Sequence, residues 1–114
     1  MPDIKTVEAI HSWVVENIEY VPDTFDSWQF PQRTLERGAG DCEDSAILIA
    51  YLCKRAGIDC RLVIYRNISE RLHMAAEIDG LCYSGNFPYP EVVDEWRIKW
   101  RLTLDEALAL AVIR

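Results

Sequence analysis

The segment from Asp41 to Gly57 constrains the fold of this chain more than any other part of the sequence. After Asp41, apolar residues cover more than one side of a helix, a pattern typical of a helix buried on most of its surface. Asp41 suits the N-cap, Asp44 stands three residues later as in a capping box, and Gly57 suits the residue after the helix end. The sequence therefore predicts a central helix around which the rest of the chain packs.

Strand-like segments follow this helix. Residues 60–66 and 72–78 have the apolar character of strands, and Asp79-Gly80 comes directly after the second of them. Asp-Gly between two apolar runs is typical of a two-residue hairpin turn. Residues 96–102 alternate between large apolar and basic side chains, which predicts a further strand.

Helices are also expected towards both ends of the chain. Residues 3–19 place apolar side chains on one helical face, and residues 103–106 form a capping box that opens a helix reaching about Ile113. A helical turn is expected at 34–37, after an irregular, proline-containing loop. Segregated helices and an antiparallel sheet make the fold class α+β, and 114 residues suit a single domain over residues 1–114.

Composition excludes several classes of partner. The net charge of −7 leaves no cationic surplus to neutralise phosphates, so binding to bare nucleic acid is not expected. No apolar run approaches the roughly 20 residues of a membrane span, so no membrane partner is expected. Residues 1–13 form a polar, helix-like start rather than a signal peptide, and we expect a cytoplasmic location.

Four cysteines and two histidines limit the metal and redox chemistry. No C-x-x-C pair occurs and the histidines add no zinc-like spacing, so we expect neither a metal site nor a cofactor. Without a secretory context the thiols are expected to be reduced, with Cys53 and Cys60 serving as packing residues.

The predicted hairpin brings two polar residues together. Counting outward from the Asp79-Gly80 turn, His73 lies directly opposite Asn86, and opposed residues project from the same face of a sheet. A carboxamide there can hold one imidazole nitrogen and leave the other to face a thiol. A bulge at Gly85 would shift this pairing by one residue.

Cys42 supplies the thiol, at the start of the central helix. The helix dipole and the free N–H groups of the first turn stabilise a thiolate, and a protonated His73 stabilises it further. With Asn86, these residues form a Cys-His-Asn set suited to acyl transfer. The alternative is that His73 is an ordinary sheet residue and Asn86 a turn residue. Glu43 and Asp44 are expected to act as helix caps and surface charges.

Two stretches carry a family resemblance. "GDCEDSAILIAYLCKRAGIDCRLV", followed by "HMAAEIDGLCYSGN", resembles the core of the transglutaminase-like superfamily, and the upstream segment is similar to its bacterial and archaeal cysteine protease branch. The resemblance covers about residues 8–90. It implies a papain-like fold in which the helix that carries the cysteine packs against a small antiparallel sheet.

The resemblance also implies roles for individual residues. Cys42 is expected to be the nucleophile and His73 the general base and acid. Asn86 stands where the family usually has Asp, and Ala75 stands where many relatives have Trp. An amide brings no charge to stabilise an imidazolium, although papain-like enzymes use Asn in this role.

An oxyanion hole needs N–H donors aimed at the developing negative oxygen. The backbone N–H of Cys42 is one candidate, and the side chain of Trp28 or Gln29 is the candidate for the second. The alternative is that Trp28 anchors the core and Gln29 faces solvent.

Other prominent side chains are expected to be structural. His11 lies one residue off the apolar stripe of its helix, so we expect it to be partly exposed. The indoles of Trp96 and Trp100 are expected to pack in the core, as is Met74, which faces away from His73.

These observations favour a cysteine-dependent acyl-transfer enzyme. The Cys42 thiolate attacks an amide carbonyl, His73 protonates the leaving nitrogen, and the thioester passes its acyl group to water or to an amine. The branch resemblance favours a peptidase or amidase with a peptide or protein substrate. The alternatives are a transglutaminase, a catalytically inactive binding module, or a redox protein that uses Cys42 with Cys53 or Cys60.

Overall fold

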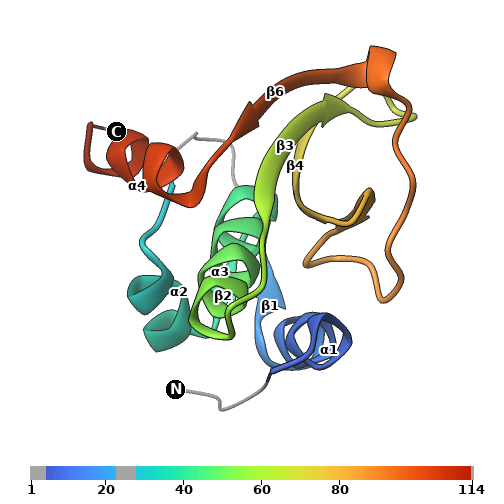
Figure 1. Ribbon diagram of the computed structural model, residues 1–114. Coiled ribbons are helices and arrows are strands. Elements are labelled where there is room, and N and C mark those ends of the chain that lie inside the picture. Colours follow the sequence, from blue (N-terminus) through green and yellow to red (C-terminus); the bar gives the residue numbers. More distant parts are fainter. Residues whose placement is uncertain (1–4, 23–27, 114) are drawn as a thin grey trace.

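The chain folds around one central helix. The computed structural model describes residues 5–22 and 28–113. The elements in order are α1 (Val7–Asn17), β1 (Glu19–Tyr20), α2 (Pro31–Arg37), β2 (Ala39–Gly40), α3 (Cys42–Arg55), β3 (Arg61–Arg66), β4 (Leu72–Ile78), β5 (Leu81–Tyr83), the 3-10 turn η1 (Glu95–Arg97), β6 (Ile98–Leu102) and α4 (Leu104–Ile113). The sheet has the order β5-β4-β3-β6, with antiparallel neighbours. Figure 1 shows α3 between this sheet and the helices α2 and α4, which confirms the α+β prediction.

The central helix begins and ends as its sequence predicts. Asp41 is the N-cap: its Oδ1 accepts a hydrogen bond from the N–H of Asp44 at 3.1 Å, and Asp44 Oδ2 accepts one from the N–H of Asp41 at 3.2 Å. These two bonds form a complete capping box. Gly57 follows the helix with φ of 76°, a left-handed conformation that glycine adopts without strain.

The predicted hairpin turn is also confirmed. Ile78 pairs with Leu81, and the two residues between them have positive φ, 52° at Asp79 and 79° at Gly80. Positive φ at both central positions is the mark of a type I′ turn, whose twist suits the flanking antiparallel strands.

The N-terminal region differs from its prediction. α1 begins after Thr6, whose Oγ1 accepts a hydrogen bond from the N–H of Ala9. α2 begins at Pro31 rather than at residue 34, because proline suits the first helical position, where its missing N–H is not needed. The sequence does not predict the parallel pairing of β1 with β2, which sets Tyr20 opposite Gly40, just before α3.

Parts of two predictions lie outside the described residues. These are the first two positions of the predicted helix over residues 3–19, and residues 23–27 of the predicted loop. At the other end of the chain, the predicted capping box is confirmed, since Thr103 Oγ1 accepts from the N–H of Glu106 and Glu106 Oε1 accepts from the N–H of Thr103. Among the described residues, no helix combines the length and apolar character that crossing a bilayer would require.

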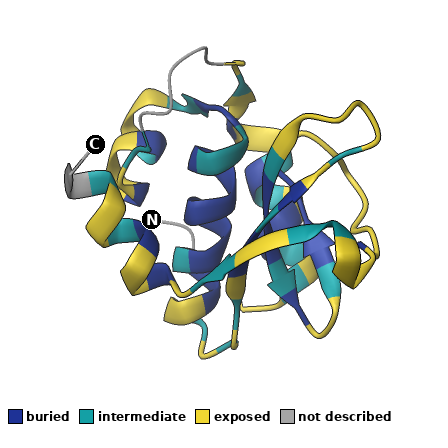
Figure 2. Ribbon diagram, turned by 90° about the horizontal axis from the view of Figure 1, so that it is seen from above, coloured by how far each residue is buried: buried dark blue, intermediate teal, exposed yellow. Residues whose placement is uncertain are grey.

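The apolar core surrounds α3. One cluster joins α3 to α1, β4 and β5 and includes Ile10, Val14 and Leu48. Another joins α3 to β3, β4 and α4 around Ile47 and Leu62. Figure 2 shows the resulting band of buried residues along α3. Core packing thus fixes the helix against the sheet, and with it the position of Cys42.

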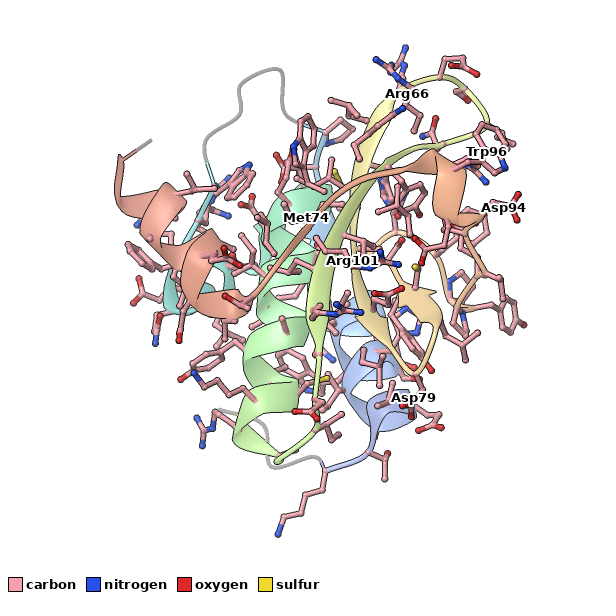
Figure 3. All side chains as sticks on the ribbon, turned by 45° about the horizontal axis from the view of Figure 1, so that its top comes forward. Arg66, Met74, Asp79, Asp94, Trp96 and Arg101 are labelled. Atoms are coloured by element: carbon pink, nitrogen blue, oxygen red, sulfur yellow. The ribbon has the colours of Figure 1, made fainter. Side chains whose placement is uncertain are left out.

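The predicted burial of two tryptophans is wrong. Trp96 is 79% exposed and Trp100 is 57% exposed. Trp96 belongs to η1 rather than to a strand, and Figure 3 shows it at the outer end of the molecule. Trp100 lies on β6, an edge strand of the sheet. The expectation for Met74 is confirmed, since it is 1% exposed and packs in the core.

Candidate active site

Cys42 is the first residue of α3, directly after the Asp41 cap. Its side chain is half-buried, and the backbone N–H of Met74 lies close enough to lower the pKa of its thiol. Met74 follows His73 on β4, so the fold brings the start of the helix against the strand that carries the histidine. The two residues that sequence reasoning assigned to the nucleophile and the base thus lie on adjoining elements.

The surroundings of these two residues favour their neutral forms. Burial and the charge of Glu43 raise the pKa of the Cys42 thiol to about 12, with the Met74 N–H acting in the opposite direction. Burial lowers the pKa of His73, and the charge of Glu91 opposes this shift. Both shifts favour the uncharged thiol and the uncharged imidazole.

The acids beside Cys42 have different roles. Asp41 and Asp44 are buried and form the capping box, which confirms their structural interpretation. Burial is the main cause that raises the pKa of Asp41 to about 7 and that of Asp44 to about 6. Glu43 is half-buried, and its charge acts on the thiol. It is therefore more than the expected surface charge.

Gln29 anchors the loop before α2 and the start of α3. Its backbone N–H donates to Asp44 Oδ1 at 2.8 Å, and its Nε2 donates to Asp44 Oδ2 at 2.9 Å and to Thr34 Oγ1 at 3.3 Å. Arg37 donates to its Oε1 at 2.5 Å. Because its amide donors are engaged inside this network, Gln29 fits neither the predicted oxyanion role nor the solvent-facing alternative.

Trp28 lies beside the histidine. It is half-buried, packs against the core cluster around Ile47 and Leu62, as the alternative expected, and lines a pocket of about 390 Å³ together with His73. The residues around this pocket are mostly apolar: Trp28, Glu43, Ile64, Leu72, His73, Met74 and Trp100.

The predicted pairing of His73 with Asn86 does not form. The β4–β5 ladder has the predicted register but ends at Tyr83, and His73 Nε2 lies 2.8 Å from Ser84 Oγ. The chain turns away because Gly85 packs against α3, where a Cβ on it would lie 2.2 Å from the Cβ of Ser45. Asn86 comes after this turn and is exposed.

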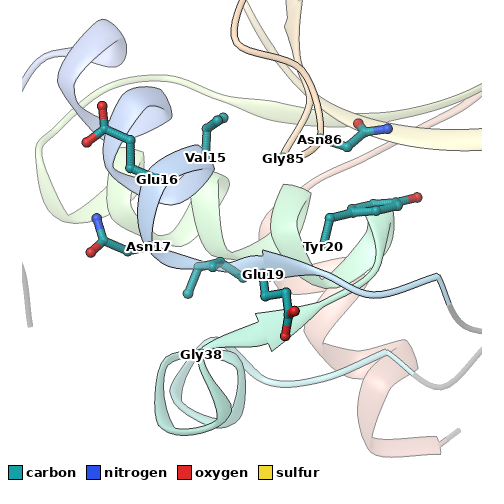
Figure 4. A pocket seen from close by; sticks show the side chains of 9 residues that line it. Val15, Glu16, Asn17, Glu19, Tyr20, Gly38, Gly85 and Asn86 are labelled. Carbon is teal, nitrogen blue, oxygen red and sulfur yellow. The ribbon is translucent and has the colours of Figure 1, made fainter.

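Ser84 could have been found from the sequence. It lies two residues before Asn86, so the period of two in a strand places both on the same face. Asn86 instead lines a second pocket, of about 520 Å³, where Figure 4 shows it at the same end as Tyr20. Burial is the main cause that raises the pKa of Tyr20, which lines this pocket.

The predicted partial exposure of His11 is wrong. It is 3% exposed, its Nε2 donates a hydrogen bond to the backbone carbonyl of Ser84 at 2.8 Å, and its ring meets Tyr83 edge-on at 5.0 Å. Burial of a polar ring is compatible with the fold when its N–H finds an acceptor. That acceptor lies 73 residues away in sequence, so periodicity within the helix carries no sign of it.

The cysteines and the potential metal ligands are further candidates within the part of the chain that the structure describes. All four cysteines are free thiols, so Cys42 is not bonded to Cys53 or Cys60. Among the described side chains, no group of three or more His, Cys, Asp and Glu residues is arranged to hold a metal ion.

Comparisons with known proteins support the fold. A family model described as the transglutaminase-like superfamily matches residues 1–89, which include Cys42 and His73. Calcium-bound LapG from Legionella pneumophila superposes with a TM-score of 0.68 at 21% identity, over 82% of this chain and 60% of LapG. A "Putative Cysteine Protease" from Cytophaga hutchinsonii superposes with a TM-score of 0.59 at 24% identity, over 85% of this chain and 34% of that protein.

The chain is thus shorter than the solved structures that it resembles, spanning 60% of LapG and about a third of the Cytophaga protein. A search of curated proteins finds no match. The structural likeness confirms the predicted fold, in which the helix that carries the cysteine packs on an antiparallel sheet.

Proposed function

This chain belongs to the transglutaminase-like superfamily, and we propose that it is a cysteine peptidase or amidase that acts on peptide or protein substrates. Cys42 is the nucleophile and His73 is the general base and acid. The observation that carries this proposal is the position of Cys42 at the start of α3, where the next residue, Glu43, lines the same pocket as His73. The helix start that bears the thiol and the strand that bears the imidazole therefore meet at one pocket.

The reaction starts from a neutral pair. His73 takes the proton of Cys42 as Sγ bonds to the substrate carbonyl carbon, and the carbonyl π electrons move to oxygen. The tetrahedral intermediate then expels the amine, to which His73 gives the proton, leaving a thioester on Cys42. Water attacks the thioester while His73 accepts its proton, which releases the acid and restores the thiol.

This chemistry also requires N–H donors that stabilise the oxyanion of the tetrahedral intermediate. The backbone N–H of Cys42 belongs to the first turn of α3, where amide groups have no partner within the helix. The indole of Trp28, which lines the pocket beside His73, is the proposed second donor. Gln29 contributes indirectly, because its bonds to Asp44 fix the capping box next to Cys42.

The pocket beside His73 sets the substrate class. Ile64, Leu72 and Trp100 give it an apolar wall, so an apolar side chain near the scissile bond fits it best. Trp100 and Leu72 are more than half exposed, and a substrate side chain covers them on binding. Glu43 at the same pocket disfavours an acidic side chain there.

A fluorogenic peptide library tests this function. We expect amide hydrolysis that is lost in Cys42→Ser, with a preference for apolar residues that weakens in Trp100→Ala by about tenfold in kcat/KM. Trp96→Ala is the matched control, because this indole is exposed but does not line the pocket. Since one similar structure is described as calcium-bound, the assay is run with calcium and with EGTA.

The outcome separates the alternatives. Transfer of the acyl group to an added primary amine, in preference to water, would identify a transglutaminase. Absence of turnover with every peptide, together with absence of Cys42 acylation by an activated peptide ester, would identify a binding module that keeps the fold.

A further inference from the structure

Three polar side chains continue from His73 on the side of its Nε2 atom: Ser84, Tyr65 and Glu91. We propose that they form a proton-ordering relay that replaces the single third residue of a catalytic triad. In this relay Ser84, Tyr65 and Glu91 are positioning residues that keep the proton of His73 on Nε2 and supply negative charge to the imidazolium. The inference rests on the proposed function, because it assigns what orients the base of that same site.

The geometry brings the members of the relay together. Tyr65 is paired with His73 across the β3–β4 ladder, and their rings meet edge-on with centroids 5.5 Å apart. Ser84 is 4% exposed, with its Oγ 2.8 Å from His73 Nε2. Tyr65 is fully buried, and its hydroxyl donates a hydrogen bond to Glu91 Oε1 at 2.5 Å. The Ser84 side chain also lies close enough to the Tyr65 hydroxyl to lower the pKa of Tyr65.

Counting protons fixes the direction of each bond. A carboxylate only accepts, so the single hydroxyl proton of Tyr65 goes to Glu91. The phenol oxygen then has no proton left to give and can only accept, so the Ser84 hydroxyl donates to it. Because the hydroxyl proton of Ser84 points to Tyr65, Ser84 Oγ can only accept the hydrogen bond from the Nε2–H of His73. Nδ1 of the neutral imidazole therefore carries the lone pair and is the atom that takes the thiol proton.

Glu91 supplies the charge in this arrangement. Its negative charge raises the pKa of His73 against the opposing effect of burial, so it stabilises the imidazolium that forms during attack. Its backbone is fixed to β5 by hydrogen bonds in both directions with Cys82, at 2.8 and 2.9 Å. The other charged group at the relay is Arg97, whose guanidinium lies 5.7 Å from the ring centroid of Tyr65.

The position of Ser84 is held independently of its hydroxyl. His11 donates to the Ser84 carbonyl, and Gly85 packs closely on Ser45 of α3. Removing the Ser84 hydroxyl therefore leaves its backbone anchored. A hydroxyl alone brings no charge to stabilise an imidazolium. In the relay this charge comes from Glu91, two hydrogen bonds beyond Ser84, so a serine can take the position of the third triad residue.

The tautomer and pKa of His73 test the relay directly. Imidazole 15N NMR, with His73→Gln to assign the signals, is expected to show a neutral ring protonated at Nε2. Glu91→Gln keeps the volume and an acceptor oxygen but removes the charge, so it lowers the pKa of His73 by about half a pH unit or more. Asp94→Asn removes a charge from the same loop with no relay contact, so it leaves the pKa unchanged.

Activity gives a second readout. Ser84→Ala and Tyr65→Phe are expected to lower kcat by about tenfold or more with little change in KM, and Ser84→Thr to restore part of it. A wild-type ring protonated at Nδ1, or equal His73 pKa values in wild type and Glu91→Gln, would overturn the relay. The NMR result needs no turnover, so failure of the relay and failure of the proposed peptidase are seen separately. Should Tyr65→Phe not fold, Glu91→Gln decides alone.

Discussion

At the scale of single residues, the reactivity of Cys42 reflects opposing influences from its neighbours. The helix start and the Met74 N–H favour a thiolate, whereas burial and Glu43 oppose it more strongly, so the pKa is raised. Burial is the larger cause of this raised pKa, and the carboxylate of Glu43 adds to it.

Replacing Glu43 with Gln is expected to make Cys42 more reactive. Loss of the neighbouring negative charge lowers the thiol pKa, so alkylation by iodoacetamide at pH 8 accelerates by about threefold to tenfold. Glu36→Gln is the control, because Glu36 is exposed on α2 and has no part in the pKa shift of Cys42. An alkylation rate equal to that of wild type would show that Glu43 does not set this pKa.

Substitution of Gln29 tests whether its side chain stabilises the fold or stabilises the oxyanion. Gln29→Ala removes a donor from the buried carboxylate of Asp44, so we expect a loss of about 1–3 kcal/mol in the free energy of unfolding, measured with urea. Gln32→Ala is the control on the exposed side of α2. Unchanged stability with reduced kcat would instead favour the oxyanion role.

At the scale of elements, the site depends on where β5 stops. The hairpin turn sets the register, but the close approach of Gly85 to Ser45 ends the ladder and turns the chain. This leaves Ser84 as the last side chain that faces His73.

A double-mutant cycle measures this contact. Gly85→Ala is expected to lower the free energy of unfolding by about 1–3 kcal/mol, because the added Cβ overlaps Ser45. In a Ser45→Gly background the overlap is relieved, so the same substitution costs less. Equal penalties in both backgrounds, measured by urea unfolding, would mean that another contact ends the strand.

Elements with local signals were predictable from the sequence, and features that depend on distant partners were not. The caps of α3 and the Asp79-Gly80 turn are set by backbone chemistry within a few residues. Burial of His11 depends on the backbone carbonyl of Ser84, which follows β5 directly. Exposure of Trp100 depends on which elements cover the edge strand β6. Alternation and helical periodicity describe one element at a time, so they predict neither the burial of His11 nor the exposure of Trp100.

The candidate site divides in the same way. Cys42 and His73 follow from a helix start and a hairpin, so sequence reasoning brought them to adjoining elements. The partner of His73 was missed because register alone cannot locate the end of a ladder. Tyr65 and Glu91 join the site through strand order and a returning loop, which only the assembled sheet reveals.

At the scale of the whole molecule, the buried capping acids link stability to pH. The pKa of Asp41 is raised to about 7, so the folded state holds a proton that the unfolded chain releases near pH 4. The folded state binds more protons between these values, so this contribution is fully present below about pH 4 and is lost as the pH rises through about 7. We expect the free energy of unfolding to fall from about pH 4 to about pH 7.

Asp41→Asn tests this linkage, because asparagine also caps helices but does not titrate. Its free energy of unfolding, measured with urea across about pH 4–7, is expected to vary less with pH than that of wild type. A wild-type slope retained in Asp41→Asn would assign the titration to another group.

The central claim is that Cys42 accepts an acyl group with the help of His73. It is tested most directly by mass spectrometry of the protein after brief reaction with an activated peptide ester at pH 7. The account predicts one hydroxylamine-labile acyl group on Cys42, forming about a hundredfold more slowly in His73→Ala. Acylation of Cys60, the other half-buried thiol, at a comparable rate, or a Cys42 rate unchanged by His73→Ala, would contradict it.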